Sequence, residues 1–365
     1  MKDLAILGIR GVPAAHGGFE TFAEKLSLYL VEKDWTVTVY CQVEGAGKTG
    51  SDIWKGVRRI NIPVSRGGAA GTVIFDWKAT LHAARRHKLT LTLGYNTALF
   101  CTFLRARGIT NLINMDGIEW RRDKWSLPER AWLYLNERAG CLLGNHLIAD
   151  HPQIEKHLQT RVSSRKISMI PYGAEEIVSA DVSLLEPLGL APDGFALLVA
   201  RPEPENSILE IVRAFSRCHR GKKLVVLGNF DIQNNPYHAR VQDVASDEVM
   251  FPGAIYAKPV LAALRLHALL YIHGHTVGGT NPSLVEALGA GSAVLAHDNI
   301  YNRWVAGEGA AFFADEEECA GLLDVLMQEG TEIERMRKAS RNRFRQTFQW
   351  PMILRAYEEC LLSML

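Results

Sequence analysis

Short runs of apolar residues alternate with longer amphipathic stretches along the whole chain. Runs of four to six residues rich in Val, Ile and Leu are typical of buried parallel strands, whereas apolar residues three or four apart are typical of helices. Alternation of the two patterns indicates βαβ units. The pattern predicts strands at residues 4–7, 36–40, 89–93, 112–115, 146–149, 195–200, 223–227, 249–251, 269–273 and 293–296.

The predicted strands form two groups of five, and we expect an α/β fold with two doubly wound, Rossmann-like domains. Prolines and glycines crowd between the groups, which places the boundary there. We predict an N-terminal domain over residues 1–178 and a C-terminal domain over residues 179–345. The remaining residues, 346–365, are expected to form a helix that begins after a break at Trp350-Pro351 and packs back on the N-terminal domain.

Composition agrees with a globular, two-domain protein. The chain has 365 residues, of which 47% are hydrophobic and 22% charged, so it is too apolar to be disordered. No stretch reaches the roughly 20 apolar residues of a membrane span, and the apolar run at residues 4–7 ends in a glycine turn and not in a cleavage site. The six cysteines form no C-x-x-C pair, so we expect reduced, buried thiols in a cytoplasmic protein.

Charge is distributed unevenly between the two halves. Residues 1–180 contain 24 Lys and Arg against 17 Asp and Glu, and the remainder has 17 against 23. This asymmetry predicts an anionic partner for the first half, namely peripheral contact with the inner face of an anionic membrane and not with nucleic acid; a solvated basic face is the alternative. The cations concerned are Arg58, Arg59, Arg66, Arg85, Arg86, Lys88, Arg105 and Arg107.

Two segments of the first half follow predicted strands and carry candidate binding groups. Gly17-Gly18 opens a helix, where backbone N–H groups can approach a phosphate, although a simple tight turn explains the glycines equally well. Asp116 and Glu119 follow a later strand and could orient sugar hydroxyls or assist proton transfer. The alternative is that these carboxylates cap the next helix or pair with nearby Arg and Lys side chains.

In the second half, Arg201 follows the first strand of the group, and its guanidinium can bind a diphosphate through two parallel hydrogen bonds. A surface ion pair with Glu203 or Glu205 is the alternative. Gly228 and Gly253 form glycine turns at the ends of later strands and could shape a pocket for a base.

The segment from His273 to Gly291 carries the largest number of candidate groups. We expect a diphosphate on the loop formed by Gly279, Thr280 and Asn281, with Glu286 one turn into the following helix accepting hydrogen bonds from a ribose. His273 and His275 have a spacing that suits a metal, but no third ligand is near, so we expect His273 to be a hydrogen-bonding wall of a sugar site. Because no Asp-x-Asp occurs in the sequence, the expected chemistry is metal-independent.

Taken together, these motifs resemble the bacterial rhamnosyltransferase group within retaining glycosyltransferase family 4. The resemblance runs from about residue 1 to residue 356. It rests on four ordered segments: Gly8-Ile9-Arg10-Gly11-Val12-Pro13 with Gly17-Gly18-Phe19-Glu20-Thr21; Asp116-Gly117-Ile118-Glu119-Trp120; Ala200-Arg201 with Pro204-Glu205-Asn206; and His273-Gly274-His275 with Gly278-Gly279-Thr280-Asn281-Pro282-Ser283-Leu284-Val285-Glu286-Ala287.

The resemblance implies a GT-B fold, in which two Rossmann-like domains face a central cleft, with the acceptor on the first domain and the nucleotide sugar on the second. It further implies rhamnosyl transfer from dTDP-rhamnose, used as a substrate and without a cofactor, to a saccharide or polyprenyl-diphosphate-linked acceptor in surface polysaccharide synthesis. Glu286 matches the second glutamate of the family's E-x7-E motif, Arg201 matches its diphosphate arginine, and Gly17 and Gly18 match the loop that covers the diphosphate. Asp116 is the first choice for orienting a sugar.

The chain departs from the family pattern at two positions. The first glutamate of E-x7-E falls at Gly278, and the lysine that usually follows the diphosphate arginine is Asn206. The donor therefore stays open between dTDP-rhamnose and a UDP- or GDP-hexose. A sugar-nucleotide epimerase, a nicotinamide-dependent dehydrogenase and a binding module without catalysis are the rival readings, although the first glycine turn lacks the G-x-G-x-x-G of a dehydrogenase.

Overall fold

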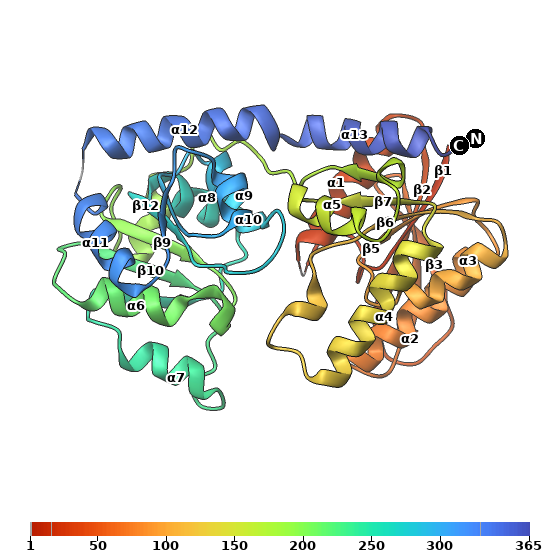
Figure 1. Ribbon diagram of the computed structural model, residues 1–365, viewed down its shortest axis with the longest axis horizontal. Helices are drawn as coiled ribbons and strands as arrows, with labels where there is room; N and C mark the ends of the chain where they lie inside the picture. Colours follow the sequence, from red (N-terminus) through yellow and green to blue (C-terminus); the bar gives the residue numbers. More distant parts are fainter. Residues whose placement is uncertain (1, 16, 329) are drawn as a thin grey trace. The chain divides into compact units, whose positions relative to one another are not determined.

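The computed structural model describes residues 2–15, 17–328 and 330–365, which form two compact units (Figure 1). The first unit comprises Met1–Tyr172 and Trp350–Leu365, and the second comprises Gly173–Gln349. Each unit is built on a largely parallel sheet with helices packed against it. The predicted fold class, α/β with two doubly wound Rossmann-like units, is confirmed.

The sheet of the first unit has the strand order β3-β4-β2-β1-β5-β6-β7-β8, and among the described residues only β3 and β4 pair antiparallel. β1 lies between β2 and β5, so the chain moves outward on one side of β1 and then resumes on the other. The strands are β1 (Asp3–Leu7), β2 (Thr36–Glu44), β3 (Gly50–Trp54), β4 (Val57–Val64), β5 (Leu89–Leu93), β6 (Thr110–Asn114), β7 (His146–Ala149) and β8 (Ile167–Met169).

In the described part of this unit, α-helices connect the strands, and a further helix comes from the end of the chain. They are α1 (Gly18–Glu32), α2 (Gly68–Ala83), α3 (Thr102–Ala106), α4 (Leu127–Leu143), α5 (Pro152–Gln159) and α13 (Trp350–Leu362). Short 3₁₀ turns are η1 (Ala98–Cys101), η2 (Glu119–Arg121) and η3 (Ser164–Lys166). Ser126 and Glu129 form a capping box at the start of α4, which fixes where that helix begins.

The β3–β4 hairpin escaped sequence prediction because it is not a buried apolar run. β3 is exposed over most of its length, and β4 alternates between buried and more exposed residues. Lys55 and Gly56 join the two strands with φ values of 48° and 82°, the conformation of a tight hairpin turn. The signal was therefore the dipeptide at the turn and not hydrophobicity.

α13 completes the core of the first unit. Its buried residues recur at helical spacing and pack against α1, where the Phe22 and Tyr357 ring centroids are 4.5 Å apart. The Glu358 carboxylate accepts hydrogen bonds from the Tyr29 hydroxyl (2.9 Å) and the Trp35 indole N–H (3.1 Å). The predicted helical break falls at Phe348 and Gln349, directly before Trp350. The buried residues of α13 are Trp350, Ile353, Leu354, Tyr357 and Leu361.

The second unit has a six-stranded parallel sheet in the order β11-β10-β9-β12-β13-β14. Neighbouring residues of β9 face opposite sides: Ala196 and Leu198 enter one apolar core, and Phe195 and Leu197 enter the other. A strand covered on both faces reads as one continuous apolar run. The strands are β9 (Phe195–Val199), β10 (Lys223–Leu227), β11 (Val249–Gly253), β12 (Leu270–His273), β13 (Val294–His297) and β14 (Ala311–Phe313).

The helices of the second unit begin mostly at polar caps. Side chains of Asn235, Asn281, Asn299 and Asp315 each accept backbone N–H groups at a helix start. The helices are α6 (Ile208–Ser216), α7 (Pro236–Asp243), α8 (Lys258–His267), α9 (Pro282–Gly289), α10 (Ile300–Ala306), α11 (Glu316–Leu326) and α12 (Thr331–Thr347), with 3₁₀ turns η4 (Val182–Leu188) and η5 (Pro204–Asn206).

Two expectations from composition, on membrane spans and on cysteines, can be compared with the structure. Within the described residues, every helix is too short or too polar to cross a bilayer. All six cysteines are free, but the expectation that they are buried is wrong for Cys218, which is exposed, and only partly right for Cys360, which is half-buried. Cys218 lies just beyond α6, where the chain leaves the core.

Candidate functional site

The topology of the second sheet singles out one edge. β10 pairs with one side of β9 and β12 pairs with the other, so the loops that leave β9 and β12 diverge from adjacent strand ends. In open α/β sheets, ligands bind outside the carboxyl ends of the strands at such a reversal of strand order. The two loops, residues 200–207 and 274–281, contain half of the site residues predicted for this half of the chain, namely Arg201, Gly279, Thr280 and Asn281.

Backbone contacts hold these two loops together. The Thr276 N–H and hydroxyl both donate to the Glu205 carbonyl, at 2.9 and 3.0 Å. At Gly274, a Cβ atom would lie 2.2 Å from the Asn206 carbonyl oxygen, a distance that no side chain tolerates. Glycine is therefore required at position 274 for the loops to approach, and any ligand at this edge meets both loops as one surface.

Arg201 is exposed on the first of these loops. Among the described residues it forms no ion pair, so pairing with Glu203 or Glu205 is not observed. Asn206 is buried, and its amide N–H donates to the Arg201 carbonyl at 2.7 Å. The residue that replaces the family's lysine thus shapes the loop, and Arg201 is the cation that this loop offers to an anion.

The second loop leads into α9. Asn281 caps the helix, because its side-chain oxygen accepts from the Ser283 N–H (3.2 Å) and hydroxyl (2.9 Å). Thr280 is buried, and Pro282 occupies the first helical position. Gly279, Thr280 and Asn281 therefore lie at the amino end of a helix, where backbone N–H groups and the helix dipole favour an anion.

Gly278 explains one departure from the family pattern. Its φ of +134° lies in the region that residues with a Cβ atom rarely adopt. A glutamate at this position would strain the loop, so the backbone conformation accounts for the absence of the first glutamate of E-x7-E.

Glu286 differs from expectation. We expected an exposed carboxylate, but its side chain is only 33% exposed and forms an ion pair with Arg265 of α8. The Arg265 side chain is 9% exposed. Glu286 therefore compensates a buried guanidinium, and sequence spacing could not reveal a partner 21 residues away.

His273 ends β12 as a fully buried side chain. Its two ring nitrogens have no hydrogen-bond partner among the described residues, and its ring stacks on His275 with centroids 4.3 Å apart. Burial, reinforced by His275 and His297, holds the pKa of His273 well below its usual range, so the ring is neutral at pH 7. A neutral imidazole with both nitrogens unsatisfied is ready to bind a ligand's polar group.

Gly228 and Gly253 lie at neighbouring strand ends, and the Gly228 N–H donates to the Gly253 carbonyl at 3.3 Å. A Cβ atom at Gly228 would lie 2.7 Å from the Ala200 carbonyl oxygen. Close packing under the Arg201 loop is therefore a sufficient reason for glycine at position 228. Their predicted part in a base pocket stays a prediction.

In the first unit, the loop between β1 and α1 is held by two carboxylates that sequence reasoning missed. Glu20 accepts from the Arg10 N–H (3.2 Å), and Glu24 accepts from the Ala14 N–H (2.6 Å). Gly17 caps α1 and Gly18 is its first residue. Glu20 already places a negative charge in this first turn, so a phosphate bound there would have to approach the N–H groups beside it.

Asp116 follows β6 in a strained position, with φ of +51°. Its N–H donates to the Asn114 side chain (3.0 Å), which in turn donates to the Tyr357 hydroxyl of α13 (2.8 Å). Burial, with Glu119 and Asp150 nearby, raises the pKa of Asp116 to about 7. Near neutral pH this carboxyl can donate a hydrogen bond when protonated and accept one when ionised.

Glu119 binds Arg122 at 2.6 Å, which agrees with the alternative that this carboxylate pairs with a nearby Arg side chain. The adjacent Trp120 donates its indole N–H to Glu137 of α4 at 2.6 Å. Although burial raises the pKa of Glu137, hydrogen bonds from His157 and Trp120 outweigh this and lower it. Glu137 was not predicted, because its role depends on a helix and a loop 17 residues apart.

Carboxylates and histidines do not gather into a metal site in the described parts of the chain, where no group of three or more His, Cys, Asp or Glu side chains could hold an ion. The local charges available to a ligand are those of Arg201, the α9 amino end and the ionisable groups described above.

Comparison with known proteins shows the fold. A family model described as a domain of unknown function (DUF1972) matches residues 1–175, less than half of the chain. A search of curated proteins found no match.

Solved structures resemble the whole chain. Sucrose-phosphate synthase from Thermosynechococcus elongatus has a TM-score of 0.84 at 17% identity, over 100% of this chain and 99% of that one. Anabaena HepE in complex with UDP and glucose has a TM-score of 0.78 at 15% identity, over 100% of both chains. A trehalose-phosphate synthase from Burkholderia vietnamiensis has a TM-score of 0.76 at 12% identity, over 100% and 97%. The fold is therefore GT-B.

The ion pair in the second unit leads to a stability prediction. Glu286→Ala leaves the Arg265 guanidinium buried without a carboxylate, and we expect the free energy of unfolding to fall by about 1–3 kcal/mol in urea denaturation. The matched control is Glu317→Ala, since Glu317 binds Arg217 on the surface and is 81% exposed; a loss below about 1 kcal/mol is expected there.

A double variant, Arg265→Met with Glu286→Ala, should recover most of the loss because it removes the buried charge together with its partner. Unfolding of Glu286→Ala at the parent's urea concentration would show that the ion pair contributes no stability.

Proposed function

We propose that this protein is a retaining glycosyltransferase that moves a sugar from a nucleotide-diphosphate donor to a saccharide or lipid-linked saccharide. One observation carries the proposal: at one edge of the second sheet, the loop that contains Arg201 and the loop that leads into α9 follow adjacent strands. The GT-B fold supports it, because structures of that fold include HepE with UDP-glucose and a trehalose-6-phosphate protein with UDP-2-fluoro glucose. The proposed location is the cytoplasm.

In the proposed mechanism, charge grows on the diphosphate as the bond to the sugar breaks. Arg201 and the N–H groups at the start of α9 stabilise that charge, without a divalent metal. The departing phosphate oxygen takes the proton of the acceptor hydroxyl while the new glycosidic bond forms on the same face of the sugar. Glu286, held by Arg265, accepts from the ribose, and His273 binds a sugar hydroxyl.

Asp116 belongs to the first unit, to which we assign the acceptor. Its raised pKa lets the carboxyl donate to or accept from a sugar hydroxyl near neutral pH. Because the N–H of Asp116 is tied to Asn114 and through it to α13, the loop presents this carboxyl in a fixed orientation.

The donor sugar is the finer part of the proposal. We infer dTDP-rhamnose from the resemblance, within surface polysaccharide synthesis, and a UDP-hexose is the rival. Gly278 supports a donor that needs no carboxylate at that position, because the backbone conformation there excludes one without strain.

A donor panel tests the function directly. We expect one of dTDP-rhamnose, UDP-glucose and GDP-mannose to raise the melting temperature in the presence of EDTA, by the equivalent of about 2.7 kcal/mol at 100 times its Kd. NADH serves as the control and should have no effect. Stabilisation by NADH alone would favour the dehydrogenase reading and overturn the proposal.

Arg201→Ala should lower kcat about 10²–10³-fold, measured as nucleoside diphosphate released with the donor found in the panel. The effect on donor KM should be smaller, because charge develops as the sugar leaves. Arg201→Lys should restore only part of the rate, since an ammonium cannot form two parallel hydrogen bonds. Turnover of Arg201→Ala within about threefold of the parent would remove Arg201 from the mechanism.

We also propose peripheral contact with an anionic membrane, now assigned to α4. This helix exposes Leu127, Leu135 and Leu142 by 80%, 56% and 76%, at a spacing of about two turns that places them on one face. Arg138 lies on the same face of α4, and Arg121 of η2 lies over the Trp120 ring; both are exposed and form no ion pair among the described residues. An apolar helical face with free cations suits an anionic lipid surface better than a second copy of the same basic face.

The cations counted from the sequence are not one cluster. Arg85, Arg86, Lys88 and Arg107 line one cavity, Arg58 and Arg86 line a second, and Arg66 lines a third, whereas Arg59 binds Asp52 at 2.6 Å. Glu137 of α4 also accepts a hydrogen bond from Trp120, which lies on the loop after β6 that carries Asp116. Contact between α4 and a membrane would therefore bring this loop to a lipid-linked acceptor.

Replacing Leu135 and Leu142 together by Asp should reduce co-sedimentation with phosphatidylglycerol-containing vesicles at least tenfold, since each buried leucine contributes about 1.5–3 kcal/mol. Val325→Asp is the matched control, because Val325 of α11 is 65% exposed. Equal binding of the parent to neutral and anionic vesicles would overturn the proposal, as would a dimer in light scattering that the double variant dissociates.

A further inference from the structure

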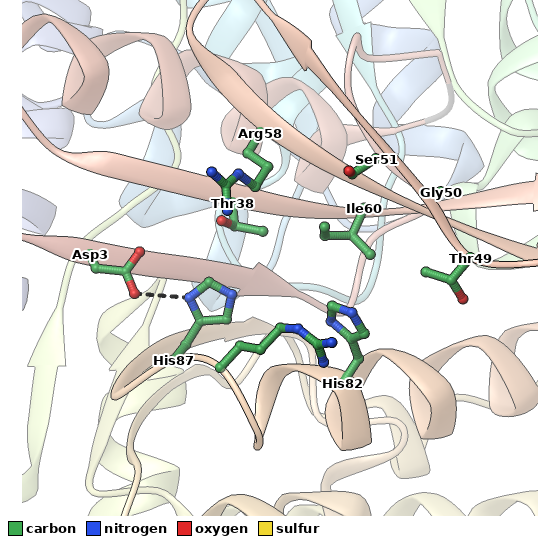
Figure 2. Close-up of a pocket in the computed structure, with 10 residues that line it drawn as sticks. Asp3, Thr38, Thr49, Gly50, Ser51, Arg58, Ile60, His82 and His87 are labelled. Carbon is green, nitrogen blue, oxygen red and sulfur yellow. Dashed lines mark hydrogen bonds and ion pairs between the residues drawn. The ribbon is translucent and has the colours of Figure 1, made fainter.

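A cavity of about 510 Å³ in the first unit lies away from the strand ends discussed above. It is lined by residues near the amino ends of β1, β2 and β4 and by the segment where α2 ends (Figure 2). Asp3 in its wall and Gly8 of the predicted phosphate loop lie at opposite ends of β1, about 13–17 Å apart at the rise of an extended strand. The cavity is therefore separate from the candidate nucleotide-sugar site.

Thr38 of β2 contributes an unsatisfied hydroxyl to this cavity. The residue is 1% exposed, and its Oγ1 has no hydrogen-bond partner among the described residues. A buried hydroxyl without a partner costs free energy, so a hydrogen bond from this hydroxyl to a ligand in the cavity would be favourable. Figure 2 shows Thr38, Arg58, His82 and His87 around the same hollow.

The histidines are oriented by partners in the cavity wall. The Tyr40 hydroxyl lies 2.8 Å from His82 Nδ1, and burial raises the pKa of Tyr40, so the phenol keeps its proton and can donate it. Accepting that hydrogen bond places the proton of a neutral His82 on Nε2, where it can be donated. His87 Nδ1 lies 2.9 Å from Asp3 Oδ2, which is the only carboxylate among the described residues of the wall.

Two guanidinium groups in the wall have no carboxylate partner. Arg58 and Arg86 are exposed and form no ion pair in the described parts of the chain. By contrast, Arg59, the neighbour of Arg58 on β4, binds Asp52. Burial, with Arg86, His87 and Arg85, lowers the pKa of His82, which is the effect expected where positive charges gather.

We propose that this cavity binds the phosphate group of a phosphate-bearing molecule. Arg58 and Arg86 supply paired N–H donors for its oxygens, and Thr38 and His82 supply single neutral donors. This arrangement suits a dianion with three free oxygens better than a carboxylate with two. The molecule is either a water-soluble phosphate ester or the headgroup of an anionic lipid, since both offer the same chemistry.

The test is isothermal titration of the full chain with inorganic phosphate and with glycerol 3-phosphate. Arg58→Gln and Arg86→Gln should each weaken binding at least tenfold, as expected for hydrogen bonds to a charged group. Thr38→Val, which keeps the volume but removes the hydroxyl, should weaken it about three- to tenfold. The matched control is Arg85→Gln, which removes the same charge beside Arg86 from a residue outside this cavity, and it should change binding less than twofold.

Several outcomes decide against the proposal. Equal weakening by Arg85→Gln and Arg86→Gln would indicate diffuse electrostatics, and undetectable phosphate binding to a folded parent would overturn the site. Vesicles of phosphatidic acid that compete with glycerol 3-phosphate, in a way that Arg86→Gln abolishes, would identify a lipid headgroup; competition by soluble esters alone would identify a free phosphate ester. Melting-point shifts by nucleotide sugars should be unchanged in all these variants, so the result is independent of the proposed glycosyltransferase activity.

Discussion

The second unit depends on one constraint of strand pairing: β10 pairs with one side of β9, and β12 pairs with the other. Parallel strands must be joined by crossovers, so all their carboxyl ends reach the same edge of the sheet. Because β10 and β12 pair with opposite sides of β9, the loops after β9 and β12 leave adjacent strand ends at this reversal of strand order. Gly274 lets the two loops touch, and the second loop leads into α9.

The polar groups at this edge rest on apolar layers that hold them still. His273 is neutral because burial disfavours its charged form, and the buried guanidinium of Arg265 is paired with the Glu286 carboxylate. Fixed donors in a partly desolvated setting stabilise developing charge more than mobile side chains in water do, because they need no reorganisation. The same packing that stabilises the sheet therefore sets the electrostatics of the site.

Sequence patterns predicted the buried strands well, because a strand covered on both faces must be apolar throughout. They missed the exposed strand β3 and its partner β4, in which buried and more exposed residues alternate. They also missed β8 and β14, which are three residues long and too short for any periodicity. Motifs located Arg201 and the loop before α9 because these residues are close in sequence. Partners distant in sequence, such as Arg265 for Glu286 and Tyr357 for Asn114, could not be found, since only the folded chain brings them together.

The position of α13 in the first unit has a consequence for synthesis of the chain. The apolar face of α1 is covered by residues that follow the whole second unit, Gly173–Gln349. On a ribosome that adds about 5–20 residues per second, that face waits on the order of 10 s or more before Trp350 to Leu361 emerge. The first unit to be made is thus the last to be completed, and chaperones have an exposed surface to bind during that interval.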